Sequence, residues 1–245
     1  MENFRVTVEY DGTAYHGWQR QKADRTIQGE IEKALTTMTG KSIPLAGSGR
    51  TDAGVHAMGQ TASFSSDAGL GPDTYLKGLN SLLPDDILIK ACESMDPAFH
   101  ARYDALSKIY PYRILNRDLP SVMERHYVWH IRRRLNVKAM QEAASFFVGK
   151  HDFKAFEGTG SPRTSTVRHV IHAGIRETDG HRVLFDIEAE GFLRYMVRNM
   201  VGTLVDVGNG RITGEDVTRI LLSRDRNQAG ATAPARGLFL MKVKY

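Results

Sequence analysis

The 245-residue sequence has a single cysteine, Cys92, and no long run of apolar residues. One cysteine excludes both an intramolecular disulfide framework and a metal site built from several thiolates. No segment approaches the roughly 18 continuous apolar residues that a membrane helix needs. The opening stretch, MENFRVTVEY, also lacks the basic and then apolar pattern of a signal peptide. We therefore expect a cytoplasmic protein with no membrane contact.

Cofactor-binding patterns are missing as well. The glycine-rich stretch GSGRTDAGVHAMGQ, residues 47–60, lacks the Gly-Lys-Ser/Thr ending of a P-loop, and it lacks the further glycine of a dinucleotide fingerprint. An aspartic-protease pair is not available either, because the chain has no second copy of this segment. What stays open is covalent or acid–base chemistry by the single carboxylate of the stretch, Asp52.

Four residues in the motif-like segments are candidate metal ligands: His56, His100, His151 and Asp152. They do not show the spacing of a ligand set, such as two histidines four residues apart on a helix. Structural or surface roles are the simpler interpretation of these side chains.

Positive charge slightly exceeds negative charge, with 33 lysines and arginines against 28 aspartates and glutamates and a net charge of +5. The local pattern is more informative, because HIRRRL places Arg132, Arg133 and Arg134 together and FLRYMVRN contains Arg194 and Arg198. Such clusters suit phosphate backbones, from which bound counterions are released. A solvated surface produces the same pattern, so the charge alone does not decide between the two.

Apolar periodicity predicts strands mixed with helices of moderate length. Residues 4–10 alternate as a half-buried strand, whereas the spacing from Ile27 onward is helical, with Gly40 as the stop. Further helices are expected from Pro72 to before Pro84, from the cap Asn136 to Gly149, over 193–207, and from Thr213 with Asp216. Further strands are expected at 60–65, 87–94 and 110–116, in a hairpin over 170–190 that turns at Asp179-Gly180, and at 237–245. This mixture indicates an α+β protein with a mainly antiparallel sheet.

Seven segments resemble the tRNA pseudouridine synthase A family from end to end and in the family's order. They are YDGTAYHGWQRQ, TIQGEIEKAL, GRTDAGVHAMGQ, FHARYDALSKIYPYRI, GKHDFKAF, GFLRYMVRNMVGTLVDVG and ARGLFLMKVKY. The segment GRTDAGVHA is highly specific. The resemblance implies an isomerase that converts uridine to pseudouridine at positions 38, 39 and 40 of the anticodon stem-loop of tRNA. It also implies a homodimer in which both subunits contact one tRNA, with neither a metal nor an organic cofactor.

The resemblance further implies a fold of two ferredoxin-like, or RRM-like, halves. Their strands would form a continuous, mainly antiparallel sheet with flanking helices and a central RNA-binding cleft. We place the halves at residues 1–105, with the catalytic aspartate loop, and 106–245, with the tyrosine and arginine motifs.

Five site residues follow from matching the motifs of the family to this chain. Asp52 matches the catalytic aspartate, and Arg198 the basic residue paired with it. Tyr110 matches the tyrosine that stacks on the uracil, and Arg50 the arginine that helps to flip the base and fills the space it leaves. Leu240 lies in the closing strand, where the family places apolar residues near the base.

The implied reaction breaks the N1–C1′ bond of uridine and joins C5 to C1′, without redox change. Asp52 must be ionised, either to attack the ribose or to initiate elimination, and the sequence leaves both routes open. Burial disfavours a charged carboxylate, and a close arginine such as Arg198 opposes that effect. Extruding the base costs a few kcal/mol, of which stacking on a tyrosine ring recovers ~1–3 kcal/mol. Two alternatives remain: an RNA-binding protein without catalysis, and a metal-dependent phosphohydrolase built on His56, His151 and Asp152.

Overall fold

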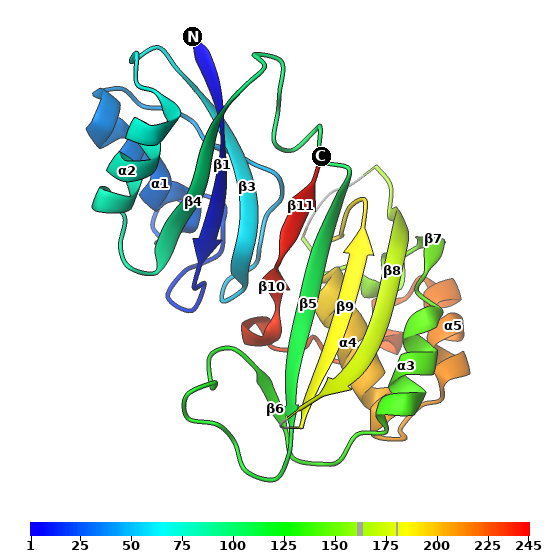
Figure 1. The fold of residues 1–245 in the computed structure, drawn as a ribbon. Coiled ribbons are helices and arrows are strands. Elements are labelled where there is room, and N and C mark those ends of the chain that lie inside the picture. Colours follow the sequence, from blue (N-terminus) through cyan, green and yellow to red (C-terminus); the bar gives the residue numbers. More distant parts are fainter. Residues whose placement is uncertain (161–163, 180) are drawn as a thin grey trace. The chain divides into compact units, whose positions relative to one another are not determined.

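The computed structural model describes residues 1–160, 164–179 and 181–245. They form two compact units (Figure 1). The first unit contains residues 1–106 and 239–245, and the second contains residues 107–238. The last strands of the chain therefore pack with the first unit, which the sequence pattern did not indicate. Among the described residues, no helix combines the length and apolar character that a membrane span requires.

The first unit follows the order β-α-β-β-α-β, which is that of ferredoxin-like folds. Its elements are β1 (Glu2–Tyr10), α1 (Ile27–Thr39), β2 (Ala46–Gly47), β3 (His56–Ser66), α2 (Pro72–Leu82) and β4 (Ile87–Met95). Strand β1 lies between β3 and β4 and is antiparallel to both. Two short strands complete the β3 side: β2 pairs with β3 antiparallel, and β10 (Phe239–Leu240) pairs with it in parallel. The chain ends with β11 (Lys242–Lys244).

The core of the first unit forms where α1 and α2 cover the sheet (Figure 1). Alternate residues of β1 are buried, as the sequence pattern predicted. The ring of Phe4 stacks on Phe64 of β3 with centroids 5.3 Å apart, and both rings contact Tyr75 of α2. Such aromatic contacts fix the helix against the sheet.

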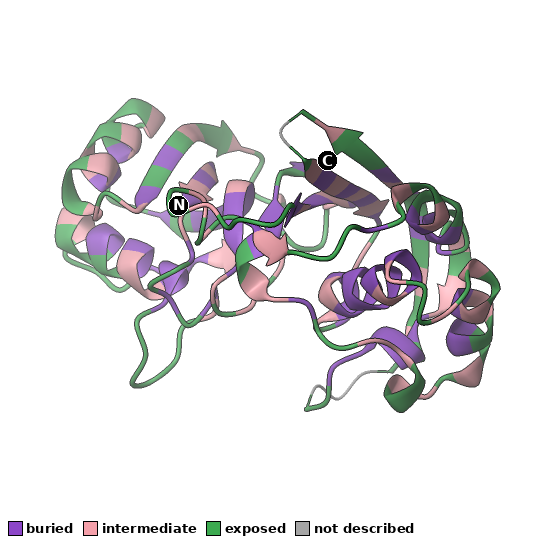
Figure 2. Ribbon diagram, turned by 90° about the horizontal axis from the view of Figure 1, so that it is seen from below, coloured by how far each residue is buried: buried purple, intermediate pink, exposed green. Residues whose placement is uncertain are grey.

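The second unit is built on the sheet order β5-β9-β8-β7, in which neighbouring strands are antiparallel. Its strands are β5 (Ser107–Asn116), β6 (Trp129–Ile131), β7 (Gly149–Asp152), β8 (Val167–Thr178) and β9 (Arg182–Ala189). Its helices are α3 (Val137–Ser145), α4 (Met196–Gly208) and α5 (Gly214–Ser223), together with 3-10 turns at Lys154–Phe156, Arg226–Gln228 and Ala235–Gly237. Helices lie against one face of this sheet, and purple bands in Figure 2 mark their buried sides.

Most predicted elements are confirmed. Gly40 ends α1 with a left-handed φ of 70°, Pro72 opens α2, and Thr213 forms a capping box with Asp216 at the start of α5. The hairpin is confirmed as β8 and β9. Of its predicted turn, Gly180 lies outside the described residues.

Three element boundaries were wrong. Helix α3 ends at Ser145 rather than at Gly149, because the next three residues bond to carbonyls three positions back, in single tight turns. Helix α4 begins at Met196, because Tyr195 before it has a left-handed φ of 61°. The closing strand is divided at Met241 into β10 and β11.

The α+β class and the mainly antiparallel pairing are confirmed. The continuity of the two sheets, the central RNA-binding cleft and the domain division at residues 105 and 106 stay predictions.

Candidate active site

Asp52 lies in the loop between β2 and β3 of the first unit and is partly exposed. The Val55 N–H donates to the Asp52 carbonyl oxygen at 3.1 Å, which closes a four-residue turn. Gly54, the third residue of this turn, has a φ of 76°. A type II turn needs a positive φ at that position, which residues other than glycine rarely adopt. One glycine of the unusual 47–60 stretch is thereby explained by the shape of the Asp52 turn.

The loop at residues 11–18 packs directly on the backbone of this turn. The Trp18 N–H donates to the Thr51 carbonyl at 3.1 Å, and the Gly54 N–H donates to the Tyr15 carbonyl at 3.3 Å. Approach is so close at Gly12 that a Cβ atom there would lie 2.0 Å from the Val55 carbonyl oxygen. The segments YDGTAYHGW and RTDAGV are far apart in the sequence. Their backbones pack against each other, and this contact holds the turn that contains Asp52.

His56 follows the turn and is buried, with an exposed fraction of 1%. Its Nδ1 accepts the Gly12 N–H at 3.1 Å and lies 3.1 Å from Asp11 Oδ1. The ring stacks on Phe239 with centroids 4.7 Å apart. His56 thus joins the 11–18 loop, β3 and β10 from inside the first unit.

The other two residues of the metal hypothesis have structural partners in the second unit. His151 Nε2 lies 2.9 Å from the Val148 carbonyl, and Asp152 forms an ion pair with Arg224 at 2.9 Å. Within the described ranges, no group of three or more histidine, cysteine, aspartate or glutamate side chains is arranged to hold a metal ion.

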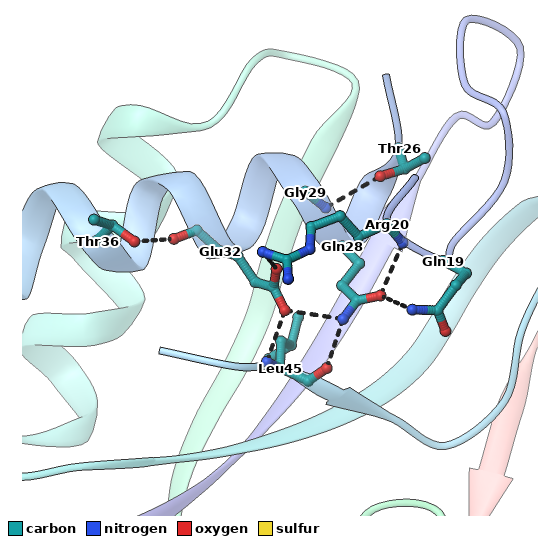
Figure 3. Close-up of polar contacts among 8 residues, drawn as sticks. All are labelled: Gln19, Arg20, Thr26, Gln28, Gly29, Glu32, Thr36 and Leu45. Atoms are coloured by element: carbon teal, nitrogen blue, oxygen red, sulfur yellow. Dashed lines mark hydrogen bonds and ion pairs between the residues drawn. The ribbon is translucent and has the colours of Figure 1, made fainter. Parts of the chain in front are cut away.

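A buried polar network fixes the chain on the way into the Asp52 loop (Figure 3). Glu32 of α1 has an exposed fraction of 7%, and its Oε1 accepts the Leu45 N–H at 3.0 Å and Gln28 Nε2 at 2.9 Å. Gln28 Nε2 also donates to the Leu45 carbonyl at 3.0 Å. Both backbone groups of Leu45, one residue before β2, are therefore held by side chains of α1.

The same network reaches the chain that follows the 11–18 loop (Figure 3). Gln28 Oε1 accepts Gln19 Nε2 at 2.8 Å and the Arg20 N–H at 2.9 Å. Arg20 Nη1 lies 3.1 Å from Glu32 Oε2, an ion pair that lacks hydrogen-bond geometry. Buried Gln28 and Glu32 thus tie together the two segments that approach Asp52. The sequence carried a weak signal for this, namely two polar residues four positions apart among the apolar residues of a helix.

Arg50 is exposed, whereas the residues just before it are fixed. Gln60 is fully buried and accepts Ser48 Oγ at 2.7 Å, and its amide nitrogen donates to the Gly49 carbonyl at 3.1 Å. The Arg50 side chain consequently extends from a segment whose backbone is held in place.

Tyr110 lies in β5 of the second unit, opposite Ile187 of β9, and only 7% of it is exposed. Its ring meets that of Phe192 edge to face, with centroids 5.1 Å apart and planes at 79°. Pro111, which lacks an N–H donor, keeps its place in the ladder opposite Asp186. Phe192, which the sequence analysis did not single out, orients the tyrosine ring.

Arg198 lies near the start of α4 and is half-buried. Its Nε donates to the Ala233 carbonyl at 2.8 Å, and its guanidinium carbon lies 4.9 Å from the centre of the Tyr195 ring. The Ala233 N–H in turn donates to the Arg198 carbonyl at 3.1 Å. Main chain and side chain of Arg198 are therefore fixed by the same neighbouring segment.

Tyr112 lies two residues beyond Tyr110 and therefore on the same face of β5. It is fully buried, and its hydroxyl donates to the Pro234 carbonyl at 2.7 Å. Burial raises the pKa of Tyr112, while the positive charges of Arg198 and Arg236 oppose that rise. The field of Arg198 thus reaches the face of β5 that carries Tyr110.

Leu240 is fully buried in β10, in register with Ala57 of β3, close to the end of the Asp52 turn. The fold of the first unit accordingly brings Leu240 close to the loop that contains Arg50 and Asp52. The second unit supplies Tyr110 and Arg198. The pairing of Asp52 with Arg198 stays a prediction.

Comparison with known proteins defines the class as RNA-modifying enzymes. The sequence model of a family described as tRNA pseudouridine synthase matches residues 6–104 and 143–245. Proteins named tRNA pseudouridine synthase A from Acetivibrio thermocellus and from a Thermoanaerobacter species are each 46% identical over 245 residues, covering 100% of both chains. The chain belongs to the tRNA pseudouridine synthase family. It is therefore an isomerase that binds RNA and forms pseudouridine in tRNA.

Among solved structures, the archaeal box H/ACA sRNP Nop10–Cbf5 complex aligns with a TM-score of 0.35 and 14% identity, covering 83% of this chain and 43% of that chain.

Proposed function

We propose that this enzyme modifies positions 38, 39 and 40 in the anticodon stem-loop of tRNA, with Asp52 as its catalytic carboxylate. The observation that carries the proposal is the rigid support of Asp52. Its turn is closed by the Val55 N–H, packed on the 11–18 loop and entered through the Gln28–Glu32 network. Catalytic groups act best when their surroundings hold them in the productive geometry before substrate binds.

The proposed chemistry conserves every atom of the uridine. The N1–C1′ bond breaks, the uracil turns within the site, and C5 joins C1′ as the proton on C5 is lost and N1 gains one. Asp52 either forms a bond to the ribose and then leaves, or removes a ribose proton and later returns it. No electrons are transferred, so neither route calls for a redox cofactor.

The remaining predicted residues have roles that suit this chemistry. Arg198 is proposed to stabilise the ionised Asp52, since a nearby guanidinium favours the charged carboxylate. The ring of Tyr110, held edge-on by Phe192, is proposed to stack on the uracil once the base has left the helix.

Two further contacts concern the path of the base. The exposed Arg50 side chain is proposed to assist base flipping and to fill the space that the base vacates. The buried Leu240 is proposed to provide apolar packing near the uracil. We also propose that the enzyme acts as a homodimer with both subunits contacting one tRNA, as the family resemblance implies. A cytoplasmic location is proposed from the sequence pattern.

Replacing Asp52 tests the proposal. Unmodified tRNA transcript is incubated with Asp52→Asn or Asp52→Ala, and pseudouridine is measured by nucleoside analysis. Both variants should form no pseudouridine and should still bind tRNA. Asp67→Asn is the matched control, because Asp67 is an exposed aspartate paired with Lys41, and it should keep full activity. Turnover by an Asp52 variant at the wild-type rate would remove Asp52 from the mechanism.

A further inference from the structure

One buried asparagine holds a surface segment that the proposed chemistry does not use. Asn116, at the end of β5, has an exposed fraction of 1%. Its Nδ2 donates to the carbonyls of Ile131 and Arg133 at 2.9 and 2.7 Å, and its Oδ1 accepts the Leu135 N–H at 2.9 Å. We call residues 131–135 the arginine strap. Three bonds from one buried side chain, at every second residue, anchor its backbone, which bends at Arg133.

The strap exposes three consecutive arginines between its anchored ends. Arg132, Arg133 and Arg134 are exposed, whereas Leu135 is buried. Arg134 forms an ion pair with Glu177 at 2.9 Å. For Arg132 and Arg133, the described part of the chain provides neither a hydrogen bond nor an ion pair to the side chain.

This arrangement has no evident role in folding. Adjacent unpaired cations repel each other, so this placement of two arginines does not stabilise the fold. The strap also lies outside the residues that the family model matches, which stop at 104 and resume at 143. Two unpaired guanidinium groups on an anchored backbone are suited to an anionic partner, for which the guanidinium fork is the preferred protein group.

We propose that Arg132 and Arg133 bind two phosphates of the tRNA backbone, at a contact separate from the nucleotide that is isomerised. This inference rests on the proposed function, because the proposed function places the target nucleotide at Tyr110. Asn116 follows Tyr110 by six residues on the same strand, which corresponds to about 20 Å at about 3.3 Å per residue. A phosphate contact at that distance fixes the register of the RNA without reading its sequence.

The expected effect can be estimated from counterion release. For each phosphate contact, the binding constant falls as the 0.7 to 0.9 power of the salt concentration, which at 0.15 M salt amounts to about 3.8- to 5.5-fold for each contact. Losing two contacts should weaken binding by about 15- to 30-fold, and it should reduce the slope of log K against log salt by about 1.4 to 1.8.

The test is a salt titration of binding to unmodified tRNA transcript, with Arg132→Gln/Arg133→Gln. The Kd should rise and the salt slope should fall as estimated, KM should rise with Kd, and kcat should be unchanged. Arg132→Lys/Arg133→Lys keeps both charges and should retain the wild-type slope. Lys33→Gln/Lys138→Gln is the matched control: it removes two exposed lysines outside the strap and should leave Kd and slope near wild type.

The proposal is overturned if the strap variant binds tRNA with the Kd and slope of the lysine control. That outcome would leave an acidic protein as the partner to be sought. Binding is measured without turnover, so the result is independent of where pseudouridine forms. A pseudouridine map that excludes the anticodon arm would refute the proposed function, whereas an altered Kd would still support the phosphate contact.

Discussion

Removal of the Glu32 carboxylate should destabilise the first unit and disturb the loop that carries Asp52. Glu32→Ala leaves the Leu45 N–H without its acceptor in a buried position. It also removes one of the two acceptors of Gln28 Nε2 and the partner of Arg20. Asp52 lies further along the chain from Leu45, so the change should affect catalysis as well as folding.

The magnitude follows from the individual contacts. A buried N–H without an acceptor costs about 2 kcal/mol, and loss of a hydrogen bond to a charged group costs about 1.5 kcal/mol. The ion pair with Arg20 adds about 0.5 kcal/mol, because the Arg20 side chain is 64% exposed. The free energy of unfolding should therefore fall by about 4 kcal/mol, which lowers Tm by about 8–16 °C for a chain of this size.

Urea titration and calorimetry of Glu32→Ala provide the assay, and pseudouridine formation gives kcat. Glu32→Gln keeps a carbonyl oxygen for the Leu45 N–H and should lose only about 1–2 kcal/mol. The matched control is Glu142→Ala, an exposed glutamate of α3, which should change stability by at most about 0.5 kcal/mol. If Glu32→Ala behaved like Glu142→Ala, the Glu32 network would have no role in holding Leu45.

Three further outcomes are expected. Tyr110→Ala should lower kcat/KM by roughly 5- to 150-fold, which is the range that loss of ~1–3 kcal/mol of stacking gives. Tyr110→Phe keeps the ring and should stay near wild type. Equal kcat/KM values for Tyr110→Ala and Tyr110→Phe would refute the stacking role. Gly12→Ala should lower kcat more than it weakens tRNA binding, because its Cβ would displace the Val55 carbonyl and with it the Asp52 turn; an unchanged kcat would contradict that. Burial raises the pKa of Tyr245 from 10.0 to about 12, so its stabilising contribution is complete below pH 10 and is lost as the pH rises towards 12. Stability curves of Tyr245→Phe should accordingly fall less steeply between pH 10 and 12, and parallel curves would refute this.

The fold was predictable wherever local chemistry decides the structure. Alternation of apolar residues located β1, and Gly40, Pro72 and the Thr213 capping box located helix ends. The end of α3 was not predictable. Phe147 is fully buried, and around it the backbone changes from α-helical hydrogen bonds to bonds between residues three positions apart, before Gly149 is reached. Tertiary packing, which periodicity does not contain, set that boundary.

The candidate site was accessible from the sequence only through motif resemblance. The resemblance supplied Asp52, Arg198 and Tyr110 but not the side chains that hold them. Glu32, which holds the chain leading to the Asp52 loop, looks like an ordinary polar residue in the sequence, and so does Asn116, which holds the arginine strap. The fold brings each side chain to backbone groups that lie 13 residues away for Glu32 and 15 to 19 residues away for Asn116. Because these partners are distant in the sequence, no local pattern reveals them.

A pseudouridine map of tRNA at single-nucleotide resolution tests the proposed function most directly. Unmodified tRNA transcripts are incubated with the wild-type enzyme and, in parallel, with Asp52→Asn. We expect pseudouridine at positions 38, 39 and 40 with the wild type and at no position with the variant. Pseudouridine confined to another arm of the tRNA, or an equal map with Asp52→Asn, would contradict the proposal.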